Sequence, residues 1–268
     1  MRSAFPGTSS AERLMPGRAL IDHGRLLAAI GYEAELLVEA ARAVPPESPV
    51  PTCPGWTVGE VVRHVGSVYR VALGWLVEGG RPSRWQRDPA RGQTVESYLR
   101  DGLTELVEVL SWHDPTETAA TWWPADRSYG FWCRRMAHET TVHRVDVEDA
   151  AGLERSEITD DFAVDGVDEA LSLWFAHKLP MLGLSGTRHG VVAINTGGHT
   201  WIARAGPVGT TARRCSPAEA AGADAVVSGR PAAVYLWLWG RQRPGAVAVE
   251  GDEDAVGQLW ALLRLATR

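Results

Sequence analysis

Hydrophobic residues recur every three or four positions along most of the first two-thirds of the chain, and this spacing predicts amphipathic helices. Proline or glycine separates one such segment from the next. The segment that begins at residue 58 has a clear start, because Thr57 and Glu60 have the spacing of a helix capping box. The predicted helices cover residues 18–44, 58–78, 94–112, 128–152 and 159–179. Long helices joined by short loops favour a helical bundle.

The pattern changes near residue 183, where alternating or continuous apolar runs end in glycine and predict strands. The predicted strands lie within residues 189–198, 199–206, 223–229 and 246–251, with helices over 230–240 and 252–266. We therefore expect an α+β chain of two domains. A four-helix bundle would cover residues 18–182, and a small α/β domain would cover residues 183–268.

Composition narrows the class of protein. A hydrophobic share of 45% and 12 tryptophans are enough for a real core, so the chain should be globular. A formal net charge of -6 and the lack of a basic stripe speak against nucleic-acid binding. Three scattered cysteines indicate a reducing compartment and no disulfide framework. No apolar run resembles a signal peptide or a membrane span, so we expect a cytoplasmic protein away from the membrane.

One stretch carries candidate chemistry: "MAHETTVHRVD", residues 136–146. His138 and His143 are five positions apart, so on a helix they point about 140° away from each other and cannot easily share an ion. Glu139 and His143 are four positions apart and lie on the same face. The stretch therefore predicts Glu139 and His143 as a pair of metal ligands and excludes the His-Glu-x-x-His site of zinc proteases.

A third ligand should come from a facing helix, and His64 is the leading candidate because it lies among valines at helical spacing. Two histidines and one glutamate leave at least one coordination position open, as in catalytic sites. Other roles stay open on spacing alone. Glu139 could pair with Arg135 four residues earlier, and His64 and His143 could be buried histidines bonded within the core.

Two segments together resemble the mycothiol-dependent maleylpyruvate isomerase family: "VPTCPGWTVGEVVRHVGSVYR" and "RRMAHETTVHRVDVEDAAG". This family of DinB-like metalloenzymes pairs a metal-binding four-helix domain with a small domain similar to sterol-carrier proteins. The segments "DAVVSGRPAAVYLWLWGR" and "VAVEGD" resemble that second domain. The resemblance implies a divalent ion, usually zinc, at His64, Glu139 and His143. Val145 departs from the pattern, since many members have tryptophan there, and this leaves the substrate open.

The resemblance also implies a reaction. Mycothiol would serve as thiol cofactor or co-substrate on a small, electrophilic and acidic molecule, either in cis-trans isomerisation or in S-transfer. Arg81, Arg84 and Arg241 are candidates to hold carboxylates of the substrate or the thiol. Asp146, one turn after His143, could orient that ligand, or it could equally pair with a nearby arginine. We expect a monomer or a homodimer.

Two rival interpretations remain at this point. Cys53 or Cys133 could be a protein nucleophile, but Cys133 has no histidine at helical spacing to act as its base, which favours structural cysteines. Alternatively, the chain could be a non-catalytic binding protein in which a metal only staples the bundle and the second domain holds a small apolar ligand.

Overall fold

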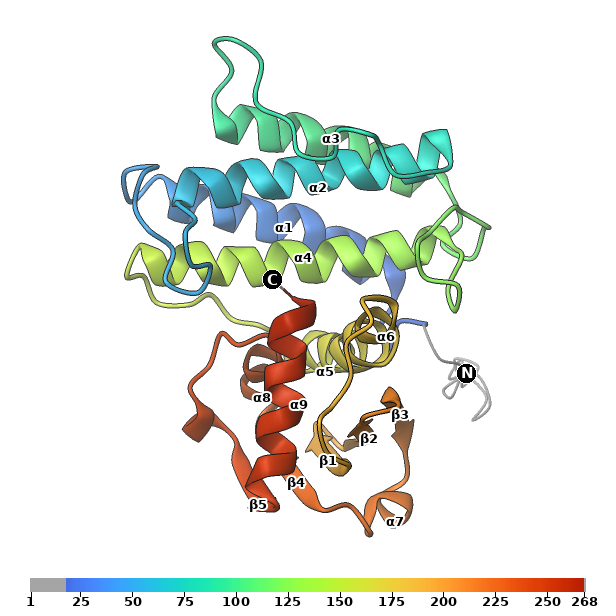
Figure 1. Cartoon of the computed structure of the whole chain (residues 1–268). Helices are drawn as coiled ribbons and strands as arrows, with labels where there is room; N and C mark the ends of the chain where they lie inside the picture. Colours follow the sequence, from blue (N-terminus) through green and yellow to red (C-terminus); the bar gives the residue numbers. More distant parts are fainter. Residues whose placement is uncertain (1–17, 268) are drawn as a thin grey trace, which may run out of the picture.

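The computed structural model describes residues 18–267, and it divides into a helical layer and a sheet-containing unit (Figure 1). The N-terminal segment in which no signal peptide is expected, residues 1–17, lies outside the described residues. The helices of the first layer are α1 (His23–Ala41), α2 (Val58–Glu78), α3 (Val95–Trp112) and α4 (Tyr129–Ala150). Thr57 and Glu60 form the expected capping box at the start of α2. The expected α+β class, a helical bundle followed by a small sheet domain, is confirmed.

The second unit is built around a five-stranded sheet with the order β3-β2-β1-β4-β5. Its strands are β1 (Gly190–Thr196), β2 (His199–Gly206), β3 (Gly209–Cys215), β4 (Ala225–Ser228) and β5 (Ala248–Gly251). Only β1 and β4 pair in parallel; the other neighbours are antiparallel. Gly197 and Gly198 both have positive φ in the two-residue turn between β1 and β2, which suits a tight hairpin.

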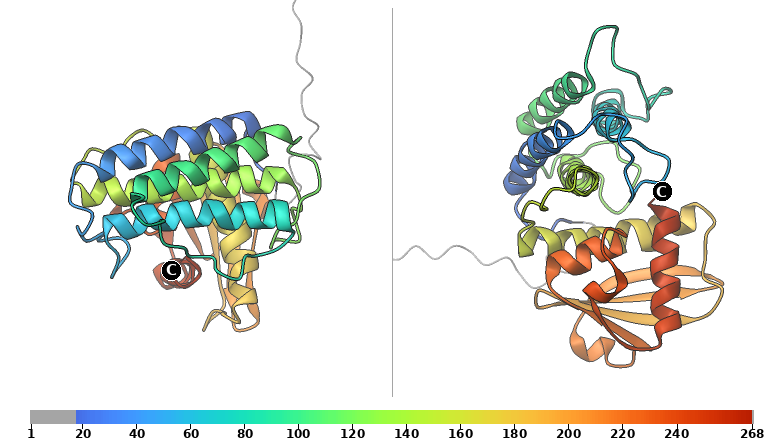
Figure 2. Two further views of the ribbon diagram at one scale, coloured as in Figure 1. Left: turned by 90° about the horizontal axis from the view of Figure 1, so that it is seen from above. Right: turned by 90° about the vertical axis from the view of Figure 1, so that its left-hand side faces the viewer.

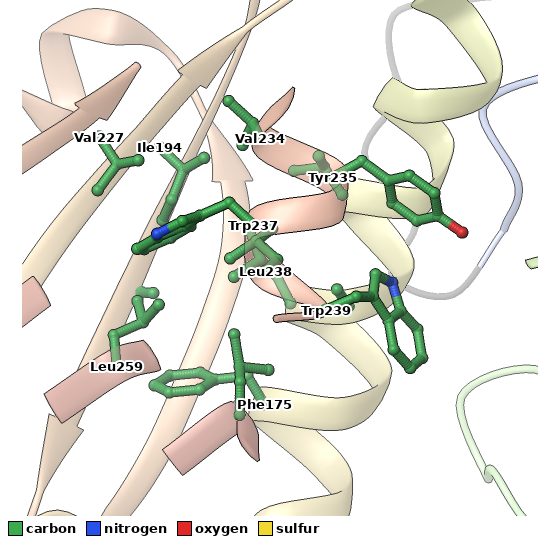
Figure 3. Packing of buried hydrophobic residues seen from close by; sticks show 14 of the residues in the cluster. Phe175, Ile194, Val227, Val234, Tyr235, Trp237, Leu238, Trp239 and Leu259 are labelled. Atoms are coloured by element: carbon green, nitrogen blue, oxygen red, sulfur yellow. The ribbon is translucent and has the colours of Figure 1, made fainter. Parts of the chain in front are cut away.

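Helices surround this sheet and carry the chain back to the bundle. They are α5 (Asp160–Glu169), the π-helix η2 (Ala170–Lys178), α6 (Leu179–Met181), α7 (Pro217–Ala220), α8 (Pro231–Leu238), the 3-10 turn η3 (Pro244–Ala246) and α9 (Glu253–Ala266). On α8, Trp237 packs toward Ile194 and Val227 of the sheet, whereas Tyr235 and Trp239 point away from it (Figure 3). This unit therefore presents an aromatic face to its neighbour.

Helix α4 lies between the rest of the bundle and the second unit, as Figure 1 and the right view of Figure 2 show. It is buried almost all round, and its buried residues include the charged side chains of Arg134, Arg135, Arg144, Asp146 and Glu148. Buried charges are costly unless they are paired, and here the pairs reach across to both neighbours. Arg144 pairs with Glu33 of α1, and Arg134 pairs with Asp165 of α5. Helix α4 therefore joins the bundle to the second unit through buried ion pairs.

Two contacts set the register of α2 on its neighbours. The hydroxyls of Tyr69 on α2 and Thr140 on α4 hydrogen-bond at 2.8 Å inside the core. Gly66 lies so close to α3 that a Cβ there would come within 2.9 Å of Tyr98 Cδ1 and 3.0 Å of Leu99 Cα. These contacts prevent α2 from sliding along its axis, and so they fix which of its side chains face α4.

Besides the short α7 and η3, two larger features differ from the sequence-based expectation. The strand β3 was not predicted, and the predicted helix over 159–179 consists of α5 followed by the π-helix η2. The division of the chain at residue 183 stays a prediction. Side chains of α5 and η2, such as Val167 and Phe175, belong to the hydrophobic cluster that also contains the sheet. Within residues 18–267, no helix is long and apolar enough to cross a membrane.

Candidate metal centre

Three side chains from two helices converge at one point between α2 and α4. His64 Nε2 lies 3.1 Å from Glu139 Oε1, and His143 Nε2 lies 3.4 Å from the same oxygen. One possible ligand atom from each of the three residues lies within 4.8 Å of the others. The structure thus brings together the trio expected from helical spacing and family resemblance.

Local sequence explains how the three residues meet. The capping box fixes the start of α2, and His64 follows two turns later on the face toward α4. Glu139 and His143 are four residues apart on α4, so they share one face of that helix. Their side chains stay 12%, 15% and 11% exposed for His64, Glu139 and His143, respectively. All three side chains are therefore largely buried, but none of them is completely closed off from solvent.

Aromatic rings border the trio on the solvent side. Trp56 packs edge-on to the His64 ring, with centroids 4.8 Å apart, and stacks with the His143 ring at 6.5 Å. Trp85 approaches His64 at 5.9 Å from the loop between α2 and α3. Beside them lies a cavity of about 140 Å³, lined by Trp56, Glu60, Arg63 and Gln86. The larger hollow, of about 840 Å³, lies near the start of α5 and strands β2 and β3, and none of the three residues lines it.

The imidazole of His143 is held from behind by a carboxylate. Its Nδ1 lies 2.9 Å from Asp146 Oδ2, which leaves Nε2 directed toward Glu139. Asp146 also accepts hydrogen bonds from Thr52 and from the thiol of Cys53. This carboxylate-histidine arrangement is common where a histidine binds a metal, because it fixes both the ring orientation and the proton on the other nitrogen.

The charge state of the trio follows from burial and hydrogen bonding. Burial would raise the pKa of Glu139, but hydrogen bonds with His143 and His64 hold that pKa well below its ordinary value. Burial would lower the pKa of His143, yet the bonds to Asp146, Cys53 and Glu139 raise it well above the ordinary value. For His64 burial prevails and lowers the pKa. A divalent cation at this place would compete with the proton of His143.

The donor set fits a divalent ion. Two imidazole nitrogens and one carboxylate oxygen are the ligands that zinc and similar ions take at catalytic sites, with a further position left for water or substrate. The carboxylate of Glu139 is ionised, and His143 already has the hydrogen-bond partner that metal-bound histidines use. The chemistry of the residues therefore permits a metal centre here.

His138 lies elsewhere, as its five-residue offset from His143 predicts. It is fully buried, with Nε2 2.8 Å from Asp165 of α5 and Nδ1 3.2 Å from the Tyr235 hydroxyl of α8. Burial lowers its pKa to about 4, so the ring is neutral near pH 7. The structure uses this histidine in the contact between α4 and the second unit.

The three candidate arginines occupy different places. Arg81 and Arg84 are exposed in the loop after α2, and the Arg81 guanidinium lies over the Trp85 ring, 5.4 Å from its centroid. Arg241 is buried, and it reaches Asp146 with Nε and Nη2, both at 2.8 Å. Neither loop arginine contacts the trio, whereas Arg241 touches the carboxylate behind His143.

Of the neighbours of the trio, sequence reasoning named the pairing of Arg135 with Glu139 as an alternative but missed others. Cys53 lies 3.3 Å from Asp146 and 3.5 Å from Arg241, although its position in a loop of the chain gave no hint of either partner. Arg135 binds Glu139 from four residues earlier, which is the spacing of the rival surface pair, but the arginine is buried. Its ion pair with Glu169 of α5 could not be seen in the sequence.

Comparison with known proteins assigns both parts of the chain. The sequence profile of the mycothiol maleylpyruvate isomerase N-terminal domain matches residues 27–148, and that of the C-terminal domain of the same enzyme matches residues 161–258. No curated protein matches the chain in a sequence search.

Two solved structures share the fold. A histidine-to-alanine mutant of the mycothiol-dependent maleylpyruvate isomerase superimposes with a TM-score of 0.57 at 12% identity, covering 87% of this chain and 95% of that one. A second structure of the mycothiol-dependent maleylpyruvate isomerase gives a TM-score of 0.51 at 14% identity, with the same coverage. At these identities the likeness concerns the fold.

Proposed function

The chain belongs to the mycothiol maleylpyruvate isomerase family, and on that premise we propose that it is an enzyme that uses mycothiol and a divalent ion to isomerise a small acidic substrate. The ion would be held by His64, Glu139 and His143. The observation that carries the proposal is the approach of both imidazole Nε2 atoms to one oxygen of Glu139, at 3.1 and 3.4 Å.

The ion and the thiol would each supply one part of the chemistry. A divalent ion supplies positive charge that lowers the pKa of a thiol close to it. Mycothiol supplies the sulfur nucleophile, which can add reversibly to the double bond of a cis-enone acid and so allow rotation to the trans isomer.

The chain's own residues hold and orient these partners. Trp56 and Trp85 border the trio on its solvent side, and their rings would exclude water from the reacting groups. Arg63 lines the adjoining cavity, and within residues 18–267 its guanidinium has one ion-pair partner, the exposed Asp88 at 3.6 Å, so it can bind the carboxylate of a substrate. Arg81 and Arg84 add positive charge in the loop above and would attract an acidic substrate.

The identity of the substrate is the finer part of the proposal. Maleylpyruvate is the first compound to try, because it is the substrate that the family name gives. Transfer of the thiol to an electrophile, without isomerisation, would need the same ion and the same thiol. Product analysis separates the two reactions, since isomerisation returns the thiol and S-transfer consumes it.

Metal analysis of single variants tests the ligands. We expect one divalent ion per chain in the wild type and in His138→Gln, and loss of that ion in His64→Ala, Glu139→Ala and His143→Ala. His138→Gln is the matched control, because this histidine lies on the same helix but faces Asp165 and Tyr235. Loss of metal in the His138 variant alone would contradict the ligand set.

Turnover tests the reaction. Metal-loaded protein should isomerise maleylpyruvate, or consume another electrophilic acid, only when mycothiol is present, and the Glu139→Ala variant should be inactive. If the metal-loaded wild type neither binds mycothiol nor consumes any electrophile faster than metal-free protein, the thiol mechanism fails. A metal that only stabilises the bundle of a binding protein would then explain the site better.

A further inference from the structure

Two buried arginines lie directly behind the proposed metal ligands of α4, on the side that faces the second unit. Arg241 belongs to the turn that follows α8, and Arg135 belongs to α4 itself. Arg241 binds the carboxylate of Asp146, which contacts the proposed ligand His143. Arg135 binds the carboxylate of Glu139, which is itself a proposed ligand. Arg241 is itself part of the second unit, and Arg135 is held by residues that follow α4 in the chain.

The first connection runs from Arg241 through Asp146 to His143. Arg241 donates from Nε to Asp146 Oδ1 and from Nη2 to Asp146 Oδ2, a fork that fixes the plane of the carboxylate. Oδ2 of that carboxylate lies 2.9 Å from His143 Nδ1. Asp146 is fully buried. The orientation of the His143 ring therefore depends on a residue that is 98 positions later in the sequence.

The second connection runs from the second unit through Arg135 to Glu139. Arg135 Nη2 donates to Glu139 Oε2 at 3.0 Å, on the oxygen that the two histidines leave free. The guanidinium lies between two indole rings, 5.3 Å from the centroid of Trp174 and 5.4 Å from that of Trp239. It also pairs with the buried carboxylate of Glu169. Three residues beyond α4 thus fix the position of Arg135.

Trp239 and Arg241 are neighbours in one turn whose shape only glycine permits. Gly240 has φ 73°, and a Cβ at that position would lie 1.7 Å from an Arg264 guanidinium nitrogen. The amide of Arg241 donates to the carbonyl of Leu236 at 2.7 Å and closes the end of α8. The Trp239 ring points away from the sheet (Figure 3). The turn can therefore present both side chains to α4 at once.

We propose that the turn of residues 239–241 is a positioning element, through which the second unit holds His143 and Glu139 in the geometry that binds the metal. This inference rests on the proposed function. Arg241 is then a positioning residue that acts through Asp146, and it does not hold the substrate carboxylate, the role suggested by the family resemblance.

The hydrogen bonds of Arg241 support this assignment. Of its five N–H donors, four are used within the protein: two by Asp146, one by the carbonyl of Trp239 and one by the sulfur of Cys53. The side chain is 8% exposed. A guanidinium so fully engaged cannot also present a fork to a carboxylate of the substrate.

Affinity for cobalt(II), measured by competition with a chelator, tests the connection through Asp146. We expect Arg241→Gln to weaken cobalt binding about 10- to 100-fold and to change the visible spectrum of the bound ion. Arg241→Lys keeps the charge without the fork and should weaken it less. Arg214→Gln is the matched control, because Arg214 also joins the sheet to a buried carboxylate, that of Asp168 of α5. It should bind cobalt like the wild type.

A double-mutant cycle separates positioning from general destabilisation. Asp146→Asn should weaken cobalt binding by itself, and adding Arg241→Gln should weaken it less than about 3-fold further, because both changes remove the same support. Circular dichroism and the melting temperature would show that each variant is folded. Independent, multiplicative losses in the cycle would overturn the connection through Asp146.

A parallel pair of variants tests the connection through Arg135. Trp239→Phe keeps an aromatic face for the guanidinium and should bind cobalt like the wild type, because no hydrogen bond of the indole nitrogen is lost. Trp239→Leu removes that face and should weaken binding several-fold. Equal affinities of the Leu variant and the wild type would overturn this connection.

The outcomes also distinguish this inference from the proposed function. Wild-type protein that binds no cobalt would contradict the metal centre itself. A second outcome is that the wild type and the Arg241→Gln variant bind cobalt equally well and with the same spectrum, while the variant has a raised KM. That outcome would overturn only the positioning role, and it would assign Arg241 to substrate binding.

Discussion

Side chains that look alike in the sequence have very different surroundings in the fold, and the cysteines show this clearly. Cys133 lies inside the bundle on α4, and burial raises the pKa of its thiol to about 12. Cys215, at the end of β3, is only partly buried. Only the thiolate reacts quickly with alkylating reagents. Burial raises the pKa of Cys215 as well, so the clearest difference between these two thiols is their exposure.

We predict that iodoacetamide at pH 8 modifies Cys215 of the native protein and leaves Cys133 unmodified. The pKa of about 12 leaves a negligible thiolate fraction on Cys133 at pH 8, and its reactivity should rise only as the pH approaches that value. Peptide mass spectrometry after timed alkylation measures both sites, and alkylation in denaturant is the control. Equal rates in the native protein would contradict the burial of Cys133.

The sequence predicts those residues of the site whose relative positions follow from the geometry of a helix. Glu139 and His143 share a face because they are four positions apart, and the face of an amphipathic helix points His64 toward them. The bond between Asp146 and Arg241 could not be predicted, because it joins segments 95 positions apart through tertiary packing. The same holds for Arg135, whose local partner was visible while Glu169 was not.

At the scale of elements, helices with clear caps were predicted well, whereas one strand and one helical irregularity were not. Strand β3 reads "GTTARRC" and lies at the edge of the sheet, where few apolar residues are needed because one side is open to solvent. The π-helical bonding of residues 170–178 leaves no mark in the apolar spacing, since its wider turn depends on packing against its neighbours.

The cap of α2 gives a prediction at this scale. Thr57→Ala removes the side-chain acceptor for the amide of Glu60 and should cost about 1 kcal/mol of unfolding free energy. Thr57→Ser keeps the hydroxyl and serves as the matched control. Urea denaturation followed by circular dichroism measures the difference. An Ala variant as stable as the Ser variant would show that the capping box contributes nothing.

For the whole molecule, a metal between α2 and α4 should stabilise the fold, because an ion that binds only the native state shifts the unfolding equilibrium. At a free zinc concentration of about 1,000 times Kd, the stabilisation would be roughly 4 kcal/mol. We predict that chelation lowers the melting temperature of the wild type by roughly 10 °C. Differential scanning calorimetry measures the change.

The control for that experiment is the Glu139→Ala variant, which lacks the central proposed ligand. Its melting temperature should be the same with and without zinc. A drop on chelation that persists in this variant would place the stabilising ion somewhere else in the protein.

The predicted domain boundary at residue 183 can be tested with a protease. With a domain boundary at residue 183, limited proteolysis should cut first within residues 180–190, at the end of α6 and before β1, where Met181 and Leu182 are exposed. The fragments should stay associated, because Val142 and Val145 of α4 pack in the hydrophobic cluster of the second unit. Mass spectrometry identifies the site, and a first cut within residues 151–159 would place the boundary before α5.

The loop between α2 and α3 offers a route to altered specificity. It carries Gln86, which lines the cavity, and Trp85, which approaches His64, yet none of the three proposed metal ligands. Its attachment to the bundle includes the hydrogen bonds between Ser67 and the backbone of Arg87. An engineer could therefore randomise residues 81–86 to select for new electrophiles and leave the ion-binding helices untouched.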